Sequence, residues 1–191
     1  FRNQTAQTVT GVPIETGQVK VSCVGPADDW YYLGRGDVEI SQNNISGRYI
    51  RRKREDTNFT SNTAFGPAFA ANQLTTDQNL SFSGTRVFGS SMLNEARFAW
   101  IKRDLAFPEN DPDSPTATIA GLFTIGGNNN FPQGRVQSTY QFQDILTMQK
   151  GSHSLKAGAD IRYVDLDNLA AFDTKGTFTF NNLQDYMNNS A

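Results

Sequence analysis

The chain has 191 residues, and its 17 Lys and Arg against 19 Asp and Glu leave a formal net charge of -2, so no bulk positive charge attracts it to nucleic acid. One cysteine and one histidine exclude an intrachain disulfide and a zinc site built from several Cys and His side chains. The sequence contains no run of 18 apolar residues, so it predicts no membrane-spanning helix. A hydrophobic content of 37% is thin for a soluble core.

Six runs of residues alternate between apolar and polar side chains with a period of two, and each run is longer than the usual five or six residues of a globular strand. This length suits a tilted membrane crossing. The predicted strands are residues 30–41, 45–55, 78–88, 92–103, 138–149 and 152–165.

The first predicted hairpin turns at residues 42–44 and places Trp30, Tyr32, Val38 and Ile40 on the same face as Ile45 and Tyr49. Within it, the tripeptide at residues 35–37 spells an integrin-type motif. We favour the interpretation that Gly36 lets a neighbouring aromatic ring cover the backbone.

The basic cluster at residues 51–54 ends the second predicted strand. We favour a solvated strand end that prevents edge pairing, and contact with lipopolysaccharide phosphates is the alternative.

The second hairpin turns at residues 89–91, and this odd number of turn residues pairs Leu80, Phe82 and Phe88 with Trp100, Phe98 and Met92. The third turns at Lys150 and Gly151, which places Leu146 opposite Leu155. We expect all three turns at one end of the sheet.

Long connections separate these hairpins, at about residues 56–77, 104–137 and 166–191. Short turns alternating with long loops are typical of an outer-membrane barrel, whose turns are periplasmic and whose loops are extracellular. The second loop is rich in Pro, Asp, Asn and Gly, so we expect no buried core there. The predicted fold is all-β: a segment of a large antiparallel up-and-down transmembrane β-barrel.

In this barrel the apolar faces meet lipid and the polar faces line the lumen. The predicted lumen residues are Arg35, Asp37, Glu39, Arg48, Glu95, Arg97, Lys156, Asp160 and Arg162. Acids and bases are mixed among them, which suits mutual pairing more than an ion filter of a single sign. The alternatives are a soluble extracellular β-sandwich that serves binding or adhesion, and a passive porin.

Three aromatic residues in or near the second loop, Phe107, Phe123 and Phe131, are candidates for ligand contact by sugar stacking or for packing within the loop. Asp111 and Asp113 lack the further ligands of a calcium loop, and His153 has no recognisable partner for catalysis. Cys23 is expected to be an inert strand residue. We therefore predict no enzyme activity, no metal and no cofactor.

Several segments resemble TonB-dependent outer-membrane receptors of the Oar-like type, which carry a carboxypeptidase-regulatory-like domain. The strongest is residues 137–163, QSTYQFQDILTMQKGSHSLKAGADIRY, and it is similar to a recurrent barrel hairpin of that family. Residues 93–100, LNEARFAW, and Gly47-Arg48-Tyr49 resemble two of its strands. GTFTF at residues 176–180 and LQDYM at residues 183–187 resemble one of its loop segments.

The resemblance implies a transporter in the outer membrane of a Gram-negative bacterium, with membrane lipid, the TonB complex and an unidentified extracellular ligand as partners. The TonB complex would act through a plug, which we do not recognise in this sequence. The chain opens at Phe1 without a signal segment, which indicates an internal piece of a longer protein. One residue departs from the pattern: Asp144 interrupts an apolar stripe, so we expect either protein beside it or a bulge that shifts the register.

Overall fold

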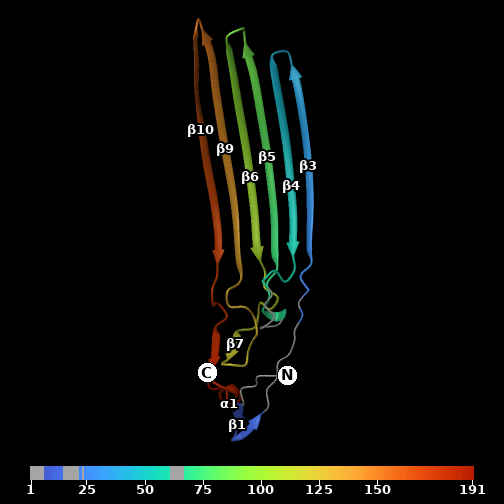
Figure 1. The fold of residues 1–191 in the computed structure, drawn as a ribbon, viewed down its shortest axis with the longest axis vertical. Coiled ribbons are helices and arrows are strands. Elements are labelled where there is room, and N and C mark those ends of the chain that lie inside the picture. The colour runs from blue at the N-terminus through green and yellow to red at the C-terminus, as the bar shows by residue number, and fades with distance from the viewer. Residues whose placement is uncertain (1–6, 15–21, 23, 61–66) are drawn as a thin grey trace.

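The computed structural model describes residues 7–14, 22, 24–60 and 67–191. Six long antiparallel strands form one sheet in the order β10-β9-β6-β5-β4-β3 (Figure 1). Their bounds are β3 Ala27–Ile40, β4 Asn43–Asp56, β5 Gln73–Phe88, β6 Met92–Phe107, β9 Gln133–Lys150 and β10 His153–Ala170. Each strand pairs with the long strand next to it in the chain, so the up-and-down topology is confirmed.

The two ends of the sheet differ as the sequence predicted. All three hairpin turns lie at one end, and the long connections lie at the other (Figure 1). Within the described residues no second sheet covers the apolar face, where Phe142, Ile161 and Tyr163 remain 57%, 67% and 63% exposed. The alternative of a soluble sandwich is therefore wrong, because a sandwich would bury these side chains.

The hairpin of β5 and β6 has the predicted register. Leu80 pairs with Trp100, Phe82 with Phe98 and Phe88 with Met92. The three-residue turn between Phe88 and Met92 keeps even positions opposite even positions, which gathers the aromatic rings on one face.

The hairpin of β9 and β10 has the predicted faces but a different register. Leu146 pairs with Ala157, and Leu155 pairs with Met148, so the expected pairing of Leu146 with Leu155 is wrong. The turn consists of Gly151 and Ser152, and Gly151 has a φ of 60°. Glycine adopts this conformation at little cost, so it takes the first turn position and Lys150 stays in the strand.

The first hairpin is corrected in the same way. Its turn is Ser41 and Gln42, since Ile40 pairs with Asn43, and the predicted three-residue turn is wrong. The Asn43 side chain donates a hydrogen bond of 3.1 Å to the Ile40 carbonyl, which stabilises the shorter turn. Val38 pairs with Ile45, so the predicted sharing of one face is confirmed.

The strands also extend beyond the predicted segments at the loop end. β9 begins at Gln133 and β10 continues to Ala170. Charged residues such as Asp165 and Asp167 end the apolar alternation on the outer face, but backbone pairing continues past them. Ladder hydrogen bonds do not require an apolar face, which is why the hydrophobic pattern underestimates the strands.

The apolar face is organised in rows across the sheet. Phe82, Phe98, Phe142 and Ile161 form the central row. Toward the loops the next row contains Tyr49, Leu80, Trp100, Tyr140 and Tyr163, and beyond it lie Arg51, Lys102 and Asp165. A row of Tyr and Trp between an apolar band and charged residues is the girdle of a membrane interface.

Two glycines on this face differ in their surroundings. A Cβ atom built on Gly47 would lie 3.1 Å from the Phe82 ring, whereas one built on Gly36 would meet nothing within 4 Å. Aromatic cover of the backbone therefore occurs at Gly47, and the cover predicted for Gly36 is wrong. Phe82 pairs directly with Gly47, and this cross-strand position gives its ring access.

Asp144 stays on the apolar face without a bulge. The register of β9 is continuous from Gln133 to Lys150, and Asp144 pairs with Ala96 and Ala159. Asn94 donates a hydrogen bond of 2.7 Å to its carboxylate. Of the two alternatives expected for Asp144, the bulge is therefore wrong, and a neighbouring amide accompanies this acid.

The connections at the loop end fold into small elements of their own. A small mixed sheet, with one parallel and one antiparallel pair of strands, has the order β11-β7-β8. The elements are β1 Gln7–Val9, β2 Val12–Ile14, the 3-10 turn η1 Pro67–Phe69, β7 Thr116–Ile119, β8 Phe123–Ile125, β11 Thr177–Phe180 and α1 Leu183–Met187. Asn182 caps α1 by accepting a hydrogen bond from the Asp185 amide.

These connections hold the buried apolar residues of the described chain. Ile119, Phe131 and Phe180 are 1%, 6% and 4% exposed, and Ala70 and Ala71 are fully buried. The expectation that the second loop builds no core is therefore wrong. Ile119 pairs with Phe180 of a different connection, so composition within one loop does not reveal this packing.

Candidate functional site

The polar face of the long sheet carries all nine residues that the sequence predicted for the lumen. Arg35, Asp37 and Glu39 come from β3, Arg48 from β4, and Glu95 and Arg97 from β6. Lys156, Asp160 and Arg162 come from β10. Their positions alternate with the apolar residues of the same strands, so the strand period of two places them together.

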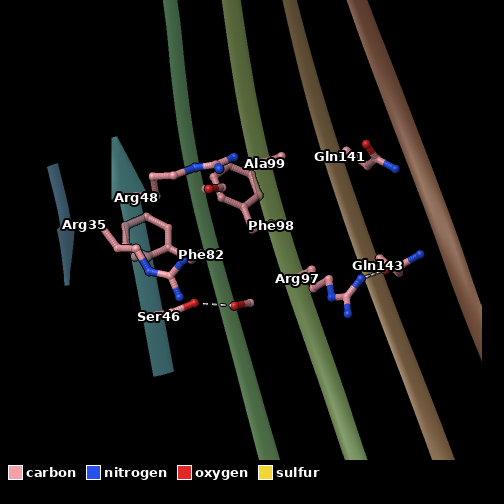
Figure 2. A pocket seen from close by; sticks show the side chains of 12 residues that line it. Arg35, Ser46, Arg48, Phe82, Arg97, Phe98, Ala99, Gln141 and Gln143 are labelled. Carbon is pink, nitrogen blue, oxygen red and sulfur yellow. Dashed lines mark hydrogen bonds between the residues drawn. The ribbon is translucent and has the colours of Figure 1, made fainter. Parts of the chain in front are cut away.

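A cavity of about 490 Å³ is hollowed into the middle of this face (Figure 2). Small side chains, Ser46, Ser81, Ser83 and Ala99, leave the space, and longer polar side chains surround it. Arg35, Arg48, Arg97, Gln141 and Gln143 line the cavity. Of the nine predicted residues, the structure thus brings three into one site.

Arg35 is neutralised within its own strand. Its guanidinium donates hydrogen bonds of 2.8 and 2.9 Å to the two carboxylate oxygens of Asp37. The two residues are two positions apart, so both point to the polar face while Gly36 points away. This bidentate ion pair lies within a strand, where the tripeptide is not presented as an adhesion loop.

Arg97 and Asp160 approach Gln143 from either side. Arg97 donates a hydrogen bond of 3.4 Å to the Gln143 side-chain oxygen, and its guanidinium lies 4.0 Å from Glu95. The amide nitrogens of Gln141 and Gln143 donate to Asp160 at 2.9 and 3.4 Å. The glutamines therefore link charged groups that do not touch one another.

A second group of ion pairs lies on the same face nearer the loops. Arg52 binds Asp29 at 2.6 Å, Arg54 binds Asp56 at 2.7 Å, and Arg103 binds Asp77 at 2.7 Å. The sequence interpretation did not include these residues among those of the lumen. The sequence did contain a signal for two of them: Arg52 and Arg54 are an even number of positions from Arg48 in the same strand, so they lie on the same face.

The basic cluster at residues 51–54 is split between the two faces. Arg52 and Arg54 make ion pairs on the polar face. Arg51 and Lys53 alternate with them and point to the apolar side, where Lys53 binds Glu55 at 2.7 Å. The cluster therefore does not act as one patch, because a strand sends successive side chains to opposite faces.

The three loop aromatics are not brought together. Phe107 and Phe131 lie 6.0 Å apart between ring centroids, and Phe131 is buried. Phe123 lies on β8 and is 41% exposed. Phe131 thus packs within the loop, and of these three residues Phe123 has the ring that is available for ligand contact.

The remaining sequence predictions concern metal binding and the residues Cys23 and His153. Among the described residues no three His, Cys, Asp or Glu side chains are grouped to hold a metal ion. Cys23 lies outside the described residues, and His153 begins β10 beside its turn, opposite Lys150.

In the part of the chain that the structure describes, no helix has the length and apolar character needed to cross a membrane.

Comparison with known proteins identifies a family. No curated protein and no solved structure matches the chain. The family described as outer membrane beta barrel domain matches residues 3–191, which is nearly the whole sequence. The single up-and-down sheet, its exposed apolar face and its aromatic girdle agree with that description. The chain therefore belongs to the outer membrane beta barrel domain family, and its place in the cell is the outer membrane.

Proposed function

We propose that this chain forms part of the barrel wall and extracellular loops of a TonB-dependent transporter, which takes up a ligand actively across the outer membrane. Within a barrel, the apolar face meets lipid and the polar face lines the lumen. The sequence resemblance at residues 137–163 supports the transporter class, and these residues form the hairpin of β9 and β10.

The observation that carries this proposal is a row of apolar side chains on the polar face. Leu33, Ile50, Ile101 and Val164 occupy one row across the sheet, together with Asn79 and Thr139. Leu33 is 58% exposed. A water-filled channel gains nothing from exposed aliphatic groups, whereas a protein plug inside the lumen would bury them.

Unsatisfied polar atoms near this row support a filled lumen as well. Within the described residues, Asn79 Oδ1 and Arg135 Nε are buried atoms without a hydrogen-bond partner. Both residues line a second hollow of about 330 Å³ that also includes Ile50 and Ile101. Buried polar groups are normally paired, and the hollow beside these residues leaves room for a plug to place polar groups against this wall.

The runner-up function is a passive porin, and two measurements on the full-length protein separate it from the transporter. The transporter is expected to bind the purified periplasmic domain of TonB and to show no steady conductance in a planar lipid bilayer. A porin would show the reverse: steady conductance without TonB binding. That second result would overturn our proposal.

A further inference from the structure

The two rows of residues that cross the cavity on the polar face carry more positive than negative charge. They hold Arg35, Arg48 and Arg162 in one row, and Asp37, Arg97 and Asp160 in the other. Four cations therefore face two anions. The next row toward the turns contains Glu39 and Glu95, of which Glu95 lies 4.0 Å from Arg97.

The pairing within these rows leaves three arginines, Arg48, Arg97 and Arg162, without a carboxylate from the same rows. Arg162 donates a hydrogen bond of 3.4 Å to the Gln141 side-chain oxygen and does not line the cavity, so the excess inside the cavity lies on Arg48 and Arg97. Asp37 is taken by both donors of Arg35, and Asp160 is held by the two glutamine amides. Among the described residues, the Arg48 side chain makes neither an ion pair nor a hydrogen bond. Arg97 has only the long contacts to Gln143 and Glu95.

The hollow between these two arginines is lined on the polar face by small side chains. Arg48 comes from β4 and Arg97 from β6, and β5 between them places Ser81 and Ser83 on the polar face. Figure 2 shows the two arginines on either side of this hollow. The hydroxyls of Ser46 and Ser83, which also line it, are hydrogen-bonded to each other at 2.5 Å. The geometry thus combines two strong cationic donors, neutral hydroxyl donors and an open volume.

We propose that this hollow binds the oxyanion group of a small anionic ligand, a carboxylate or a phosphate, between Arg48 and Arg97. Guanidinium groups match carboxylate and phosphate oxygens in bidentate geometry, and Ser hydroxyls add neutral donors. A volume of about 490 Å³ lies within the usual range for small-molecule sites. The inference rests on the proposed function, because it requires that the polar face lines the path of a ligand.

Titration calorimetry of the full-length protein in detergent at low ionic strength, with inorganic phosphate as the probe, tests this site. We expect saturable binding at one site, weakened at least about 10-fold by the double substitution Arg48→Gln and Arg97→Gln. Lys156→Gln is the matched control. It removes one cation from the same face near the turns, and phosphate affinity is expected to stay unchanged.

Arg48→Lys is the second variant if the double variant does not fold, and it removes the bidentate geometry while retaining the charge. Its phosphate affinity is expected to fall by a smaller factor than that of the double variant. Two results would overturn the site: no saturable binding by the unmodified protein, or equal affinity in every variant. Acidic groups of the same protein that already occupy Arg48 and Arg97 would give the first result. TonB binding and bilayer conductance do not depend on Arg48, so they report separately on the proposed function.

Discussion

Adjacent residues of β9 lie in two different environments. The Phe142 ring is 4.9 Å from the Phe98 ring on the apolar face, while Gln141 donates hydrogen bonds to Asp160 on the polar face. The two positions are next to each other in the strand, and their side chains point to opposite faces of the sheet. Substitutions here therefore separate the cost of facing lipid from the cost of disturbing the strand.

Phe142→Arg is expected to lower the free energy of unfolding from lipid vesicles by about 2 to 4 kcal/mol, because it places a charge near the bilayer midplane. Gln141→Arg is expected to be tolerated, since its guanidinium can pair with Asp160. Urea titration of the full-length variants measures both. Phe142→Leu is the control for loss of the ring, and equal destabilisation by Arg at 141 and 142 would mean that the faces are wrongly assigned.

Asp144 gives a prediction of the opposite sign. Its carboxylate lies in the apolar band beside Ala96 and Ala159, where a charge facing lipid is unfavourable. Asp144→Leu is therefore expected to raise the free energy of unfolding by about 1 kcal/mol in the same titration. Asp165→Leu, at the charged end of the same face, should change it little. Destabilisation by Asp144→Leu would instead mean that a protein partner or Asn94 depends on the carboxylate.

At the scale of elements, the sequence predicted the strands and their faces, which depend on the alternation of apolar and polar residues. It missed the exact turns and the buried loop residues, which depend on turn conformation and long-range packing. The pairing of Phe82 with Phe98 followed from alternation and an odd turn. The register between β9 and β10 depended instead on which residues form the turn, and Gly151 takes the turn position that requires a positive φ. The buried residues Ile119 and Phe180 pair with each other from two different connections, and no local pattern links residues so far apart.

The same limits apply to the candidate site. Alternation sends Arg35, Arg48 and Arg97 to one face, so the sequence was sufficient to group them. It did not reveal the hollow, which exists because Ser46, Ser81, Ser83 and Ala99 are small neighbours on three strands. Cross-strand register decides which small residues meet, and the sequence interpretation misplaced the turns that set the register of two of the three hairpins.

The loop elements are held together by a few polar contacts. Lys175 forms an ion pair with Glu109 in which both side chains are largely buried, and it also donates to the Asp111 carbonyl at 3.0 Å. The Asp111 carboxylate accepts a hydrogen bond of 3.0 Å from the Ser114 amide. Hydrogen bonds from the Ser114 side chain and then its backbone lower the pKa of Asp111 below its usual value of 3.8.

This lowered pKa predicts how the loop responds to acid. A carboxylate whose pKa is lower in the folded state stabilises that state above its unfolded pKa, and the stabilisation is lost as pH falls through the folded value. Amide exchange near Ser114, corrected for its intrinsic pH dependence, is therefore expected to accelerate below about pH 4. Asp111→Asn should remove this acid response. An identical response in both proteins would contradict the role of Asp111.

At the scale of the whole molecule, the six strands form a curved wall with two open edges, β3 and β10 (Figure 1). Unpaired backbone groups at a sheet edge are not tolerated in lipid, so both edges must pair with further strands in the membrane. Closed membrane barrels have at least about eight strands. The wall described here is therefore one part of a larger closed barrel.

The central claim is that one face of this wall meets lipid and the other lines the lumen. Nitroxide labels placed one at a time on β9, from residue 136 to residue 148, in the full-length protein with Cys23→Ser test it in lipid vesicles. Electron paramagnetic resonance then measures the accessibility of each label to oxygen, which concentrates in lipid. We predict high oxygen accessibility at every even position from 140 to 148 and low accessibility at the odd positions between them. Uniform accessibility along β9, or a maximum at the odd positions, would contradict the account.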